Sequence, residues 1–254
     1  MPWYARLAWV WCLVLGVLAY SVVLQAMVAT RNLNLFPTLL LIGALTVPLA
    51  VLLLTWAVGA QGRGASGIVT LTAVFGGVIG TTSAGVLEYA TLKQLPWTGM
   101  LAVGVIEEAV KLIAPVVVFL VIGRRRPDLG VVIGVASGTG FAVLETMGYG
   151  LTALVATQGN LAAVEQTLLL RALLSPAGHV AWTGLTCFAL WRMGQTGRKY
   201  AGLGFAGAYL LAVLLHAVWD GTASLLVHVV LAALSSGILI TLIVVSARSG
   251  RRAP

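Results

Sequence analysis

Charged residues are scarce in this chain: Asp, Glu, Lys and Arg make up 9% of its 254 residues, whereas soluble domains carry about 25%. The shortage excludes an ordinary water-soluble fold, because such a fold needs charge on its surface. The two cysteines, Cys12 and Cys187, lie in apolar stretches, and we expect them to pack rather than form a disulfide or a metal site. No His-Glu-x-x-His sequence occurs, which excludes the zinc-protease motif carried on a single helix.

Apolar residues dominate instead, at 60% of the chain with a mean hydropathy of +1.03. A helix needs about twenty apolar residues to cross a bilayer. Eight segments meet that length: Leu7–Ala29, Phe36–Val58, Ile68–Leu87, Trp97–Ile122, Leu129–Thr157, Ala172–Met193, Ala201–Trp219 and Ser224–Ser246. We therefore predict an all-α polytopic membrane protein with about eight transmembrane helices, forming one domain over residues 1–254.

The net charge of +8 could suggest a nucleic-acid partner, but the basic residues gather in short stretches between the apolar segments, and we predict no nucleic-acid binding. Three basic residues fall on one side of the predicted membrane: Arg31, Lys93 and Arg171. Eleven fall on the other side: Arg6, Arg63, Arg124, Arg125, Arg126, Arg192, Arg198, Lys199, Arg248, Arg251 and Arg252. Basic loops stay in the cytoplasm, so we predict cytoplasmic N- and C-termini in the plasma membrane.

Ionisable side chains inside a membrane are costly and usually functional. Seven fall within the predicted spans or at their ends: Glu107, Glu108, Lys111, Glu145, His179, His216 and Asp220. With a helical rise of about 1.5 Å per residue, four helices present these groups at a similar depth in the outer half of the bilayer. Lys111 shares a helix face with the Glu pair, and Asp220 shares one with His216. We therefore expect one polar cavity.

Carboxylates and imidazoles at one depth suit hydrolysis by an activated water. Either Glu107 or Glu108 can act as the general base. His179 and His216 can donate to the oxyanion, or they can join Glu145 as ligands of a Zn²⁺ ion. A metal-free glutamate mechanism stays open as the alternative.

Structural interpretations compete with each of these roles. Lys111 can pair with the Glu residues and lock the helices together. A histidine can serve packing alone, as we expect for His228. Asp220 and Arg171 lie near the membrane boundary, where charged side chains can reach water without a site. Pro115 and Pro176, beside the polar residues, would free backbone carbonyls, and neighbouring glycines would allow close helix packing.

At these residues the chain resembles the PrsW family of intramembrane proteases, relatives of the CAAX prenyl protease and Abi superfamily. The similar pieces, in family order over Gly104–Gly221, are EEAVK, GFAVLETMGY, RALLSPAGHVAWTG and HAVWD. One departure is Thr146, where the family usually has Asn.

The resemblance implies an intramembrane endopeptidase with a catalytic core over about residues 97–221. It implies catalytic or metal-binding roles for Glu107, Glu108, His179 and His216, with Lys111, Glu145, Arg171 and Asp220 supporting them. The implied substrate is a membrane-anchored protein, such as an anti-sigma factor, cut near the outer face. Two other functions stay open: an ion- or proton-coupled transporter, since buried acids and histidines also build ion pathways, and a non-enzymatic immunity-type protein.

Overall fold

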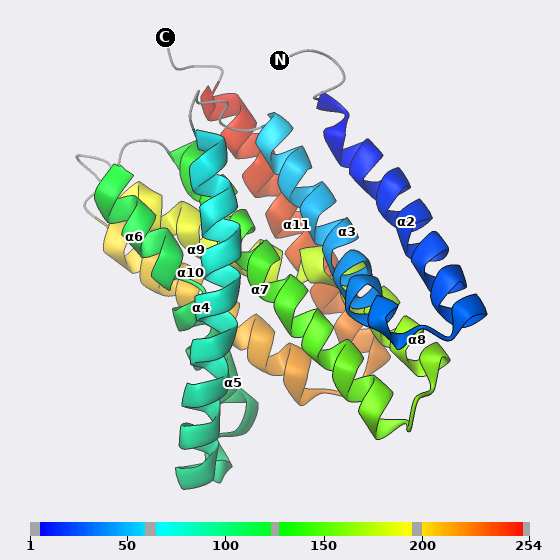
Figure 1. Cartoon of the computed structure of the whole chain (residues 1–254). Coiled ribbons are helices and arrows are strands. Elements are labelled where there is room, and N and C mark those ends of the chain that lie inside the picture. Colours follow the sequence, from blue (N-terminus) through cyan, green and yellow to red (C-terminus); the bar gives the residue numbers. More distant parts are fainter. Residues whose placement is uncertain (1–5, 59–64, 123–126, 195–199, 251–254) are drawn as a thin grey trace.

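The computed structural model describes residues 6–58, 65–122, 127–194 and 200–250. Across these ranges the chain forms only helices and their connections (Figure 1), which confirms the all-α prediction. The α-helices are α2 (Ala8–Thr30), α3 (Phe36–Val58), α4 (Ala65–Gln94), α5 (Gly99–Val110), α6 (Ile113–Ile122), α7 (Pro127–Ala156), α8 (Leu161–Leu174), α9 (His179–Met193), α10 (Ala201–Gly221) and α11 (Leu225–Gly250). The 3₁₀ turns are η1 (Leu33–Leu35), η2 (Pro96–Thr98) and η3 (Ser175–Ala177).

Six helices within the described ranges are long and apolar enough to cross a membrane: α2, α3, α4, α7, α10 and α11. The predicted segment Trp97–Ile122 is instead divided between α5 and α6, and the segment Ala172–Met193 contains the 15-residue α9. Ahead of α9 lies α8, most of which falls between two of the predicted spans. The count of eight crossings therefore stays a prediction.

The start of α2 and the end of α11 lie at the same end of the bundle (Figure 1), as an even number of crossings requires. The orientation itself stays a prediction. Many of the basic residues on which it depends lie outside the described residues: Arg63, Arg124, Arg125, Arg126, Arg198, Lys199, Arg251 and Arg252.

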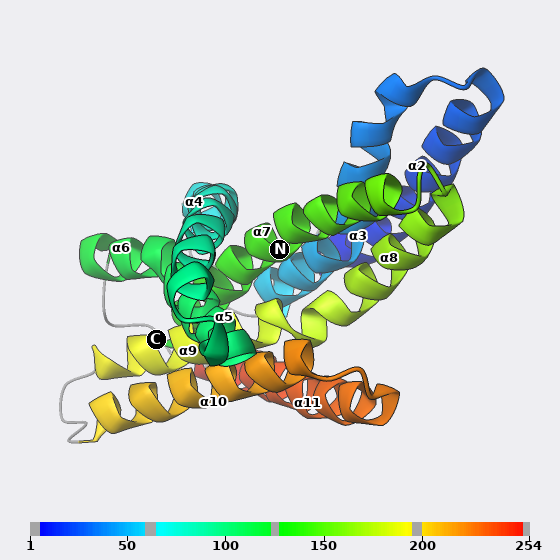
Figure 2. The ribbon, with the colours of Figure 1, turned by 90° about the horizontal axis from the view of Figure 1, so that it is seen from below.

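Helix α7 is the central element, and it lies between α4 and α9 (Figure 2). Glycines on two of its faces permit this packing. A Cβ atom at Gly138 would lie 2.5 Å from the carbonyl oxygen of His179, the first residue of α9. On the face toward α4, a side chain at Gly140 would meet the carbonyl of Ala73. Close packing through small residues is how membrane helices associate, because lipid gives no hydrophobic drive between them.

The break between α5 and α6 is caused by Pro115, which has no N–H to donate to the carbonyl of Lys111 four residues earlier. The hydroxyl of Ser137 on α7 donates to that carbonyl instead, at 2.7 Å. This confirms that Pro115 frees a carbonyl. Lys111 consequently lies at the end of α5, and its side chain is fully buried.

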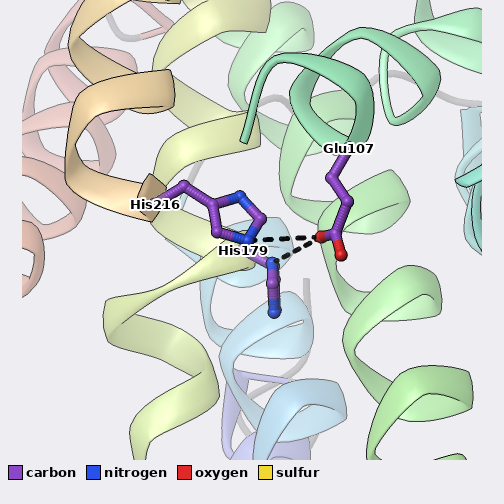
Figure 3. Close-up of side chains that lie close together, drawn as sticks. All are labelled: Glu107, His179 and His216. Carbon is purple, nitrogen blue, oxygen red and sulfur yellow. Dashed lines mark ion pairs between the residues drawn. The ribbon is translucent and has the colours of Figure 1, made fainter. Parts of the chain in front are cut away.

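A second break separates α8 from α9. Pro176 lies in η3, where the chain leaves the path of α8, and Gly178 (φ −120°, ψ −119°) then changes its direction. His179 is consequently the first residue of α9, and its side chain lies beside Glu107 and His216 (Figure 3).

Candidate active site

Glu107 on α5, His179 on α9 and His216 on α10 meet at one point (Figure 3), with one ligand-capable atom from each lying within 4.8 Å of the others. Glu107 Oε2 lies 3.4 Å from His216 Nε2 and 3.9 Å from His179 Nδ1. Glu107 and His216 are buried. Three residues far apart in the sequence thus form one compact group.

The second nitrogen of each imidazole contacts a carboxylate. His216 Nδ1 lies 2.9 Å from Glu108 Oε1, and His179 Nε2 lies 2.8 Å from Glu145 Oε2. Such contacts fix the orientation of an imidazole and determine which nitrogen is free to act. They therefore direct His216 Nε2 and His179 Nδ1 toward Glu107.

Lys111 places a cation in the middle of this group. Its ammonium lies 3.0 Å from Glu107 Oε2, 2.9 Å from Glu108 Oε1 and 2.7 Å from His179 Nδ1. Because an ammonium only donates hydrogen bonds, we assign Nδ1 of His179 as the acceptor, and its proton to Nε2, which faces Glu145. The ion pair that the spacing predicted is present, and it is part of the site.

Asp220 and Arg171 form the outer side of the site. Asp220 Oδ2 lies 3.1 Å from His216 Nε2, and its side chain is 33% exposed. An Arg171 guanidinium nitrogen lies 2.7 Å from Glu145 Oε2, and the guanidinium stacks on the ring of Tyr149. Both residues line a pocket of about 290 Å³ next to His179.

The residues present fit a divalent metal ion. Glu107 Oε2 and His216 Nε2 are buried and make no well-aligned hydrogen bond to any described residue, although the Lys111 ammonium lies 3.0 Å from the first and Asp220 Oδ2 lies 3.1 Å from the second. One carboxylate oxygen and two imidazole nitrogens form a common ligand set of catalytic zinc. Glu107 takes the place in this set that the sequence had suggested for Glu145, which contacts Arg171 and the far nitrogen of His179.

The charges of the group agree with this fit. Four carboxylates (Glu107, Glu108, Glu145 and Asp220) contact two cations and two imidazoles. With the carboxylates ionised and the imidazoles neutral, four negative charges face two positive ones; a divalent cation would balance the remaining two charges, as would protonation of two of these groups. Buried charge without such balance is expensive.

Two site residues were not identified from the sequence. Trp182, three positions after His179 on α9, has its ring centroid 5.1 Å from that of His216 and 5.7 Å from that of His179, and its N–H donates to Ser235 Oγ at 2.9 Å. Glu88 on α4 has a buried carboxylate oxygen with no hydrogen bond among the described residues, within electrostatic range of Glu107.

The spacing along α4 could have revealed Glu88. The buried small residues Thr72, Gly76, Gly80 and Ala84 recur every four positions, and Glu88 is the next in that series. Residues four apart share a helix face. The predicted span had ended at Leu87, whereas α4 continues to Gln94.

The model of the PrsW family intramembrane metalloproteases matches residues 38–247, which is most of the chain and includes every residue of the site. No curated protein matches the chain, and no solved structure does.

Proposed function

The chain belongs to the PrsW family of intramembrane metalloproteases, and we propose that it hydrolyses a peptide bond in or beside the transmembrane segment of a membrane-anchored protein. The observation that carries the proposal is the convergence of Glu107, His179 and His216 beside a pocket within an apolar helical bundle. We further propose a plasma-membrane location, with the site in the outer half of the bilayer and a substrate of the anti-sigma-factor type.

Glu107, His179 and His216 would hold the metal, for which Zn²⁺ is the best candidate because the ligand set is mixed carboxylate and imidazole. A zinc ion supplies Lewis-acid polarisation of a peptide carbonyl and lowers the pKa of bound water to about 7. Glu108 and Glu145 hold the two imidazole rings in place through their far nitrogens.

Proton transfer is the role of Asp220 in this proposal. Glu108 is buried and is not among the residues that line the pocket. The Asp220 carboxylate lines the pocket and lies 3.1 Å from His216 Nε2. Asp220 Oδ2 can take a proton from the attacking water and pass it to the leaving amine nitrogen, a transfer that usually contributes about 10²- to 10⁴-fold to the rate. Lys111 balances the charge of the Glu pair and does not react.

Cleavage in reconstituted liposomes tests the proposal. The probe is a pool of synthetic single-span peptides that carry about twenty apolar residues, a randomised outer boundary and a fluorophore–quencher pair. We expect the wild type to cut members of the pool and Glu107→Gln to cut none.

Glu165→Gln provides the matched control. It changes a carboxylate on α8 to the same amide, outside the group of contacts described above. It should cut as the wild type does. Cleavage by Glu107→Gln at the wild-type rate would overturn the role of Glu107, and a wild type that cuts no peptide would count against the protease itself.

A further inference from the structure

The 290 Å³ pocket beside the site has both polar and apolar walls. It shares His179 and Asp220 with the site and extends between α8, η3, α10 and α11. Leu174 and Trp219 form apolar walls, and Leu225, which is 77% exposed, lies at its rim. Leu225 is the first residue of α11, a helix long and apolar enough to cross a membrane, and we take this rim as the side from which a membrane-embedded segment reaches the site.

Two hydrogen-bond donors in this pocket have no partner among the residues that the structure describes. Ser175 is 6% exposed, and its Oγ makes no hydrogen bond within the described residues; the same holds for Nε of Arg171. Both residues line the pocket. A buried donor without a partner costs about 1–3 kcal/mol, so these two donors together lower the free energy of unfolding.

The hydroxyl of Ser175 lacks the partner that other hydroxyls in this chain use. Thr55, Thr72 and Thr167 each donate to the carbonyl four residues earlier, the usual arrangement within a helix. For Ser175 that carbonyl belongs to Arg171; it accepts from the Ser175 backbone N–H, but among the described residues the Ser175 hydroxyl makes no hydrogen bond to it. Ser175 lines the pocket, and its hydroxyl has no acceptor among the described residues.

A substrate of an intramembrane protease needs hydrogen-bond donors where its helix unwinds. A transmembrane helix satisfies its own backbone, because lipid offers no hydrogen bonds. A segment that unwinds to present its peptide bond for hydrolysis exposes carbonyl groups, each of which then needs a donor.

We propose that this pocket binds the unwound main chain of the substrate next to the scissile bond, with Ser175 Oγ–H and Arg171 Nε–H donating to its peptide carbonyls. An apolar substrate side chain fills the space between Leu174 and Trp219. This inference rests on the proposed function and adds to it the substrate-binding residues and the kind of side chain that is accepted.

Photocrosslinking measures this binding without requiring hydrolysis. In the Glu107→Gln background, p-benzoylphenylalanine replaces Leu225 at the rim of the pocket. A control protein carries it in place of Leu203, which is 72% exposed near the start of α10. The probe is the same pool of single-span peptides. We expect crosslinks from position 225 and few from position 203.

Substitution of Ser175 supplies the second measurement. Ser175→Ala should raise the peptide concentration for half-maximal crosslinking about five- to tenfold, the effect of one hydrogen bond. Ser175→Thr keeps the hydroxyl and should bind as the parent does. Ser246→Ala removes another buried hydroxyl without a partner in the described residues, near the far end of α11, and should change nothing.

The results separate this inference from the proposed function. Equal crosslinking from both positions, or the same half-saturation with Ser175→Ala, overturns the inference even if the wild type cleaves. Crosslinking that depends on Ser175, in a protein whose wild type cuts none of the peptides, supports the binding site and counts against the protease. In a cleaving protein, Ser175→Ala should raise KM and leave kcat nearly unchanged.

Discussion

Replacing Gly138 with alanine should separate the geometry of the site from the stability of the bundle. The new Cβ would lie 2.5 Å from the carbonyl oxygen of His179, and ordinary contact begins at 3.4 Å, so the first turn of α9 must move by about 0.9 Å. A misplacement of about 1 Å can reduce catalysis about 10²-fold. We therefore expect kcat/KM for peptide cleavage to fall by about two orders of magnitude.

The stability of the protein should change much less. Overpacking costs about 1–3 kcal/mol, and the better helix propensity of alanine returns about 1 kcal/mol. Gly148→Ala is the control, because it makes the same change on the same helix where a Cβ would meet nothing within 4 Å. If Gly138→Ala cleaves as fast as Gly148→Ala, the position of His179 does not limit the reaction and the reasoning is refuted.

Two further substitutions test the charges of the site. Lys111→Met leaves the buried carboxylates of Glu107 and Glu108 without their cation, which should lower the free energy of unfolding by about 3–5 kcal/mol. Adding Glu108→Gln should recover part of this loss in denaturant unfolding, and an unchanged single variant would contradict the ion pair. Asp220→Asn should reduce kcat by about 10²- to 10⁴-fold while metal content stays at the wild-type level, and full activity would exclude Asp220 from proton transfer.

The sequence predicted most of the helices because apolar length alone identifies a membrane span. It could not predict that the fourth segment breaks, since Pro115 can kink a helix or end it. Ser137, on another helix, satisfies the freed carbonyl of Lys111 and allows the break. Helix α8 was missed because Glu165, Gln166 and Arg171 lower its hydropathy, although it packs against α3 and α7.

The sequence predicted which residues belong to the site better than it predicted which of them contact one another. From depth and spacing we expected Glu107, His179 and His216 to lie in one cavity, and in the structure their side chains lie close together. Spacing defines faces within one helix and says nothing of how α5 is rotated against α7. It therefore could not decide whether Glu107 or Glu145 lies beside His216 Nε2 and His179 Nδ1. Ser175 lies in the η3 turn, which spacing does not reveal either, and its hydroxyl has no partner in the part of the chain that the structure describes.

Metal content measured together with cleavage tests the central claim most directly. The wild type, His216→Ala and the control His228→Ala are purified in detergent and assayed by elemental analysis and with the peptide pool. The account predicts about one Zn²⁺ per chain, as expected for one site, in the wild type and His228→Ala, with loss of both metal and cleavage in His216→Ala. A wild type that cleaves without bound metal and resists chelators would contradict it, and Glu107 would then activate water alone.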